Sequence, residues 1–136
     1  MSDARDRRVR IGFGAANLFT AVLVYAGVFR GLPTRWAPVD VGAVVVIALS
    51  AASGLALLAD RRGAVALARV SSIVVLALGM IVFAALVLTA SWLAGVYGQV
   101  GRGGALVFFL VAAMVLPYAI VVPAAELLWL GPPQRR

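Results

Sequence analysis

The hydrophobic pattern divides the chain into four long apolar segments joined by short polar stretches. These segments cover residues 11–29, 39–59, 70–93 and 105–130. The last is 26 residues long and carries a single ionisable side chain, Glu126. At 1.5 Å per residue, a helix of that length exceeds the roughly 30 Å of a bilayer's hydrocarbon core. Each segment is therefore predicted to be a transmembrane helix.

Short connections between consecutive helices favour antiparallel neighbours. The sequence therefore predicts an all-α membrane protein, a single domain over residues 1–136, with four transmembrane helices in a compact up-down bundle. Gly131 followed by two prolines is predicted to stop the last helix. The third apolar run resumes at Ala64, so its first turns are expected to lie in the head-group layer.

The polar stretches between the segments are predicted to be a tail, a loop, a turn and a connector. In that order they are Met1–Arg10, Arg30–Pro38, Asp60–Gly63 and Gly95–Gly104. Asp40 stands at the start of the second segment, where a carboxylate can cap the free amides of a helix N-terminus.

A basic stretch followed by an apolar run also describes a signal peptide, and Val24-Tyr25-Ala26 resembles a cleavage site. The apolar run is long for a signal peptide. We therefore expect the first segment to be retained as a helix.

Composition argues against a soluble protein and against an enzyme. The chain is 64% apolar with a mean hydropathy of +1.07, far above the globular range. It has no Cys and no His, which removes thiolate chemistry, the usual zinc and haem ligands and His-based acid–base catalysis. We expect no enzymatic activity, no cofactor and no metal site.

The net charge of +7 comes from an excess of arginine, which supplies all twelve basic residues. Because these arginines flank apolar segments, they are expected to orient the chain and to contact anionic lipids rather than nucleic acid. With the N-terminus inside, nine arginines lie on the inner side: Arg5, Arg7, Arg8, Arg10, Arg61, Arg62, Arg69, Arg135 and Arg136. Three lie on the outer side: Arg30, Arg35 and Arg102.

This bias predicts that both termini are cytoplasmic. Trp36 and Trp92 then lie near the outer interface and Trp129 near the inner one, as in an aromatic belt. The Arg, Ala, Val, Gly and Leu bias is typical of a high-GC bacterial genome, so the predicted location is a bacterial inner (plasma) membrane.

Glu126 is the main candidate for an intramembrane polar site. An ionisable side chain inside a membrane costs several kcal/mol unless it is paired, and here it also faces the negative end of the helix dipole. An ion pair with Arg69 is the preferred explanation, with Arg61 or Arg62 as fallback partners. The alternative is that Glu126 carries a proton or cation.

Two prolines interrupt the same segment. Pro117 and Pro123 provide no N–H to the carbonyls of Ala113 and Ala119. Broken backbone coordinates ions in some transporters, but a kink is the more common result. Tyr118 could donate a hydrogen bond to a freed carbonyl.

Small and polar residues indicate how the helices pack. Gly12-x-x-x-Ala16 and Ser50-x-x-Ser53-Gly54 offer flat faces for close helix contact. Asn17 and Thr20 share one face of the first helix and are expected to hydrogen-bond across the bundle. A ligand pocket formed by these two residues and Tyr25 is the alternative.

The sequence therefore favours a small, non-catalytic accessory or scaffolding subunit. Its predicted partners are the lipid bilayer and either a membrane protein or further copies of itself, bound through helix faces. The alternative is a small oligomeric transporter or channel that uses Glu126 and the Pro-broken fourth helix.

Overall fold

The computed structural model describes residues 2–31 and 33–130, with side chains from residue 6 onward, and within these ranges it contains helices and no strand. Four helical segments are long and apolar enough to cross a membrane. The prediction of an all-α chain with four such helices is confirmed.

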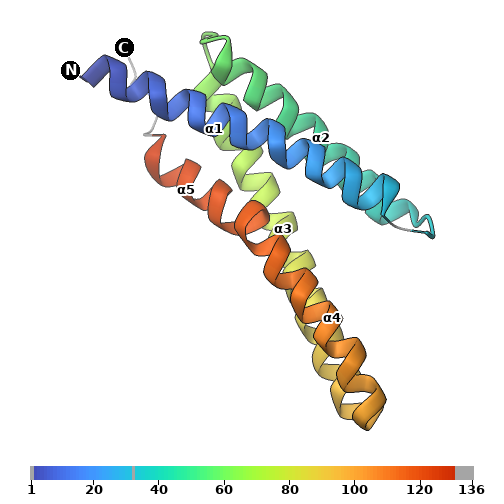
Figure 1. The fold of residues 1–136 in the computed structure, drawn as a ribbon. Helices are drawn as coiled ribbons and strands as arrows, with labels where there is room; N and C mark the ends of the chain where they lie inside the picture. The colour runs from blue at the N-terminus through green and yellow to red at the C-terminus, as the bar shows by residue number, and fades with distance from the viewer. Residues whose placement is uncertain (1, 32, 131–136) are drawn as a thin grey trace.

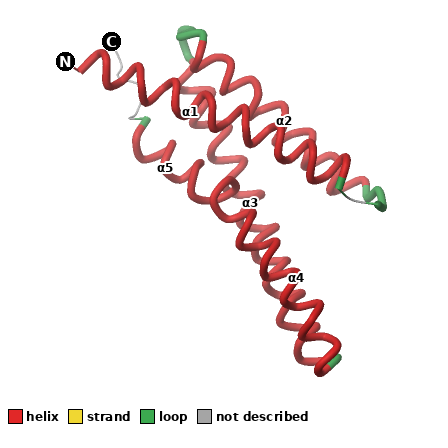
Figure 2. Tube along the Cα trace, viewed as in Figure 1, coloured by secondary structure: helices red, strands yellow, loops and turns green. Residues whose placement is uncertain are grey.

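The four segments follow one another with short connections (Figures 1 and 2). The fourth is divided in two by a π-helical stretch. The helices are α1 (Ser2–Val24), continued by the π-helix η1 (Tyr25–Arg30), α2 (Ala37–Leu58), α3 (Ala64–Val96), α4 (Gly98–Leu116), the π-helix η2 (Pro117–Val121) and α5 (Val122–Trp129).

The helices form two hairpins, α1–α2 and α3–α4, that meet at one end and diverge at the other (Figure 1). At the shared end α3 packs against α2, and α5 packs against both α3 and α1. Beyond it, α4 packs mainly against α3. The molecule is thus a bundle only at the shared end, whereas the sequence led us to expect compact packing along the whole length.

Glycines bring α1 and α2 into close contact. A Cβ atom on Gly54 would lie 2.8 Å from the Gly14 carbonyl oxygen, and one on Gly14 would lie 3.1 Å from the Gly54 carbonyl oxygen. The predicted packing face at Ser50, Ser53 and Gly54 is buried. The predicted face at Gly12 is wrong, because Gly12 faces open space and the contact falls two residues later, at Gly14.

At the shared end, the start of α1 contacts the turn between α2 and α3. The turn uses left-handed backbone at Asp60 (φ 48°) and Gly63 (φ 86°). Arg10 forms an ion pair with Asp60. Residues 2–10, predicted to be a tail, are instead the first turns of α1, and Arg10 lies beside the turn between α2 and α3.

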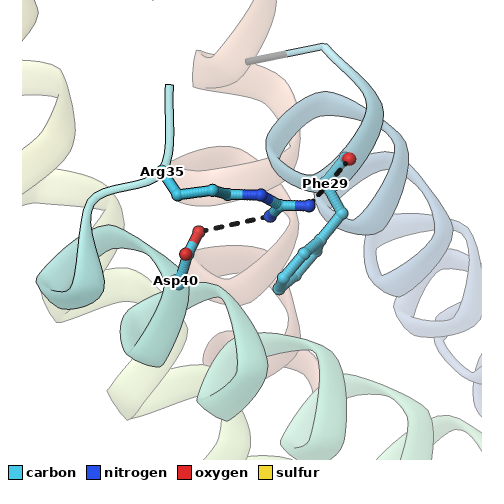
Figure 3. A network of polar contacts seen from close by, with 3 residues as sticks. All are labelled: Phe29, Arg35 and Asp40. Atoms are coloured by element: carbon cyan, nitrogen blue, oxygen red, sulfur yellow. Dashed lines mark hydrogen bonds and ion pairs between the residues drawn. The ribbon is translucent and has the colours of Figure 1, made fainter. Parts of the chain in front are cut away.

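At the far end of the first hairpin, Arg35 connects the last turn of η1 to the first turn of α2 (Figure 3). Its guanidinium lies 3.5 Å from the Asp40 carboxylate and donates a hydrogen bond to the Phe29 carbonyl at 3.2 Å. The Arg35 Cζ atom also lies over the Phe29 ring, 4.8 Å from the ring centroid. Asp40 was predicted to cap the N-terminus of α2, but it lies inside the first turn of the helix. Because Pro38 is preorganised for a first helical turn, α2 begins earlier, at Ala37.

The turn between α3 and α4 is tighter than the predicted connector over residues 95–104. Only Tyr97 separates the two helices, and Gly98 takes a left-handed conformation (φ 57°). A Cβ atom on Gly101 would lie 2.0 Å from the Leu93 carbonyl oxygen, so glycine is required there. These glycines allow an immediate reversal instead of a long loop.

The arginines separate between the two ends of the molecule. Arg61 and Arg62 belong to the turn between α2 and α3 at the shared end, where Arg10 pairs with Asp60. Arg35 precedes α2 and Arg102 lies in the second turn of α4, at the two diverging ends. The predicted helix stop at residues 131–133 and the charges of Arg135 and Arg136 lie outside the described residues.

The Pro-broken segment packs closely on α3. Pro123 has no N–H to offer the Ala119 carbonyl, and that carbonyl lies against Gly79 of α3. A Cβ atom on Gly79 would lie 2.4 Å from the Ala119 oxygen and 2.8 Å from the Ala119 Cβ. The direction of the chain changes across η2, which agrees with the predicted kink (Figure 1).

We predict that Gly79→Ala destabilises the protein by about 1–3 kcal/mol, because the new methyl group meets backbone rather than a flexible side chain. Gly95→Ala on the same helix is the matched control, since a Cβ atom there meets nothing within 4 Å. Thermal unfolding in detergent compares the two variants. Equal melting temperatures would contradict the close contact between α3 and η2.

Candidate functional site

One polar cluster joins all four helical segments. We define the Glu126 cluster as Glu126 of α5, Asn17 of α1, Ser53 of α2 and Ser72 of α3. The Glu126 side chain is only 1% exposed. Asn17 Nδ2 donates to its two carboxyl oxygens at 3.0 and 3.2 Å, and Ser72 Oγ donates to Oε2 at 2.5 Å.

The cluster extends to α2 through the same amide. Asn17 Nδ2 also lies 3.2 Å from Ser53 Oγ, and the Ser53 hydroxyl donates to the Ser50 carbonyl at 3.1 Å. Within the described residues, every buried polar side-chain atom has a hydrogen-bond partner. The polar groups that the helices bury in this region are therefore satisfied by one another.

The local sequence explains why these side chains share one layer. Asn17 follows Arg10 by seven residues and Ser53 precedes Asp60 by seven residues, which places both about 10 Å from the charged shared end. Ser72 lies at a comparable depth on α3. Small side chains let the helices approach, and Ala68, one turn before Ser72, is completely buried.

The structure does not form the predicted ion pair between Glu126 and Arg69. Among the described residues, the ion pairs are Arg10–Asp60 and Arg35–Asp40. Neutral donors satisfy Glu126 without bringing a second charge out of water, which would add a further desolvation penalty. Arg69 stays half-buried on α3, where its long side chain can extend toward the aqueous interface.

Thr20 is buried but does not join the cluster. Its hydroxyl donates to the Ala16 carbonyl of its own helix at 2.9 Å. Tyr25, the third residue of the alternative ligand pocket, is 51% exposed. Of the three residues considered for that pocket, only Asn17 reaches a polar partner on another helix.

Tyr118 makes a different contact from the one expected. Its ring packs edge-on against Phe19 of α1, with ring centroids 5.6 Å apart. The contact lies between the two hairpins, since Phe19 belongs to α1 and Tyr118 to η2. Tyr118 therefore adds an aromatic contact to the junction that the Glu126 cluster forms.

Sequence reasoning missed Ser72 as a functional residue. The sequence did carry a signal, namely the distance of Ser72 from the turn at residues 60–63. Ser71 and Ser72 follow that turn by about as many residues as Ser53 precedes it. Two hydroxyls at equal depth on neighbouring antiparallel helices can serve one buried acceptor.

The geometry determines what the cluster can do chemically. A serine hydroxyl 2.5 Å from a carboxylate resembles a nucleophile beside its base. However, both Ser72 and Glu126 are at most 2% exposed, so a substrate cannot reach them in this conformation. The cluster instead connects α5 to α3 within the second hairpin, and the bonds from Asn17 of α1 to Glu126 of α5 join the two hairpins.

The chain matches no model of a known protein family, and comparisons with curated proteins and with solved structures give no match either.

We predict that Ser72→Ala lowers the free energy of unfolding by about 1–2 kcal/mol, because it removes a hydrogen bond to a buried acid. Ser91→Ala is the matched control on the same helix. Ser91 is exposed and donates only to the Val87 carbonyl of its own helix, so the change should stay within about 0.5 kcal/mol. Equal effects in a denaturant titration would argue against Ser72 as a stabilising donor to Glu126.

Proposed function

We propose that the protein is a non-catalytic accessory or scaffolding subunit of a membrane, which binds partner membrane proteins through the free faces of its helices. The observation that carries the proposal is the state of Glu126. The only acid well inside an apolar segment is fully buried and receives hydrogen bonds from two other helices. This supports a structural role for Glu126 rather than a role in lining a path for ions or protons.

The free surface of α4 supports the same conclusion. This helix packs mainly against α3, and its large apolar side chains are exposed over several turns. Among them are Leu110 and Met114, which are four residues apart and therefore share a face. Lipid can cover such a face, and so can a helix of another protein.

We further propose that the helices cross a bacterial inner membrane in up-down order with both termini in the cytoplasm. The support is the nine-to-three distribution of arginines in the sequence and the position of Arg10, Arg61 and Arg62 at the turn between α2 and α3. The chain has no native cysteine, so single-cysteine variants report topology directly.

We expect Arg62→Cys to react with a membrane-impermeant maleimide only after the cells are permeabilised, because the turn after α2 lies inside. Gln99→Cys, at the turn after α3, should react in intact cells. Both residues lie at exposed turns, so unequal reactivity reports sidedness rather than burial. Labelling with the opposite pattern would reverse the proposed orientation.

Partner binding is tested by mild-detergent purification from native membranes. We expect Leu110→Ala and Met114→Ala each to reduce retention of a copurifying membrane protein by about fivefold, as for the loss of a modest interface anchor. Val41→Ala is the control, because the exposed fraction of Val41 lies between those of Leu110 and Met114 but Val41 belongs to α2, which already packs against α1 and α3.

The transporter alternative predicts a different result. Proteoliposomes containing the protein would then show proton or cation flux that Glu126→Gln abolishes. Under our proposal, wild-type protein and Glu126→Gln give the same background flux, while the variant unfolds more easily. Flux that depends on Glu126 would rule out the scaffold as the primary function.

A further inference from the structure

A shallow groove lies between α3 and α4 near the turn that joins them. Its volume is about 350 Å³. Three small residues, Ala90, Ala94 and Ala105, line it together with the larger apolar residues Leu106 and Phe109. Arg102 and Ser91 are the lining residues with polar side chains.

The groove is polar at one end and apolar along its length. Arg102, Ala105 and Phe109 follow one another at helical spacing, so they line one face of α4. Arg102 lies in the second turn of that helix, whereas Phe109 lies two turns further from the end, about 10 Å deeper in the apolar segment. A molecule that fits this arrangement has an anionic head and a hydrocarbon tail.

Arg102 has no acidic partner on its own hairpin. The sequence contains no Asp or Glu between Asp60 and Glu126. Asp40, which lies at the far end of the other hairpin, is already paired with Arg35. A counter-ion for Arg102 must therefore come from outside the described hairpin.

Ser91 cannot supply the anion-binding donor. Its hydroxyl donates to the Val87 carbonyl at 2.9 Å, which uses its only proton. Recognition of an anion in this groove therefore depends on the guanidinium of Arg102, which presents several N–H donors to phosphate oxygens.

We propose that this groove is a binding site for one anionic phospholipid. The phosphodiester of the lipid pairs with Arg102, and an acyl chain lies in the groove over Ala94 and Ala105 toward Phe109. The proposal does not depend on the accessory role, because its ligand is a lipid and it uses the groove between α3 and α4 rather than Leu110 and Met114.

The test measures lipid adducts by native mass spectrometry of the purified full-length protein. The protein is titrated separately with phosphatidylglycerol, with phosphatidylcholine of the same acyl chains and with glycerol phosphate, which has no acyl chain. We expect the wild type to hold one phosphatidylglycerol molecule with about fivefold preference over phosphatidylcholine, as expected for one arginine at a membrane surface. Glycerol phosphate should not remain bound.

Two variants distinguish the contribution of the Arg102 charge to lipid binding from that of the apolar groove. Arg102→Gln should remove the preference for phosphatidylglycerol, while Ala105→Leu should fill the groove and reduce retention of the lipid although Arg102 is kept. Arg30→Gln is the matched control, because Arg30 is an exposed arginine at the end of the other hairpin and does not line the groove. It should behave as the wild type.

Three results would overturn the proposal. The first is an unchanged preference in Arg102→Gln, which would mean that the lipid binds elsewhere. The second is an equal loss in Arg30→Gln, which would indicate a general effect of surface charge. The third is retention of glycerol phosphate as strong as that of the lipid, which would indicate an anion site without a role for the acyl groove.

Discussion

The hydrogen bonds of Glu126 are the interaction on which the arrangement of the helices depends. In an apolar solvent a carboxyl group without partners costs several kcal/mol, so the helices that carry its donors must come together. Asn17 and Ser72 supply these donors from α1 and α3, and Ser53 of α2 shares the amide of Asn17. One buried acid thus specifies the junction between two hairpins.

Packing supports this junction with contacts that need small side chains. Lipid tails are as apolar as the helix surfaces, so hydrophobicity alone does not bring transmembrane helices together. Gly14 and Gly54 allow α1 and α2 to touch, and Gly79 allows α3 to meet the carbonyl of Ala119. Both of these contacts lie within a hairpin, whereas Asn17–Glu126 and Phe19–Tyr118 are contacts between the two hairpins.

The distribution of polar and apolar side chains along the molecule connects the structure to the proposed roles. Polar groups concentrate where the hairpins meet, and the diverging arms keep large apolar faces and one arginine-headed groove exposed. The molecule thus has a hydrogen-bonded centre and two arms with exposed apolar faces. The proposed accessory binding and lipid retention would both use the arms and leave the junction intact.

The sequence alone determined the helical character of the chain, the number of long apolar helices and the importance of Glu126 and Asn17. These properties follow from local composition, since segment length and desolvation cost can be read residue by residue. Tertiary structure decided the partner of Glu126, the choice of Gly14 over Gly12 and the divergence of the hairpins. Each depends on the rotation and depth of one helix relative to another, and in a chain this rich in Ala, Gly and Val several rotations satisfy the same hydrophobic pattern.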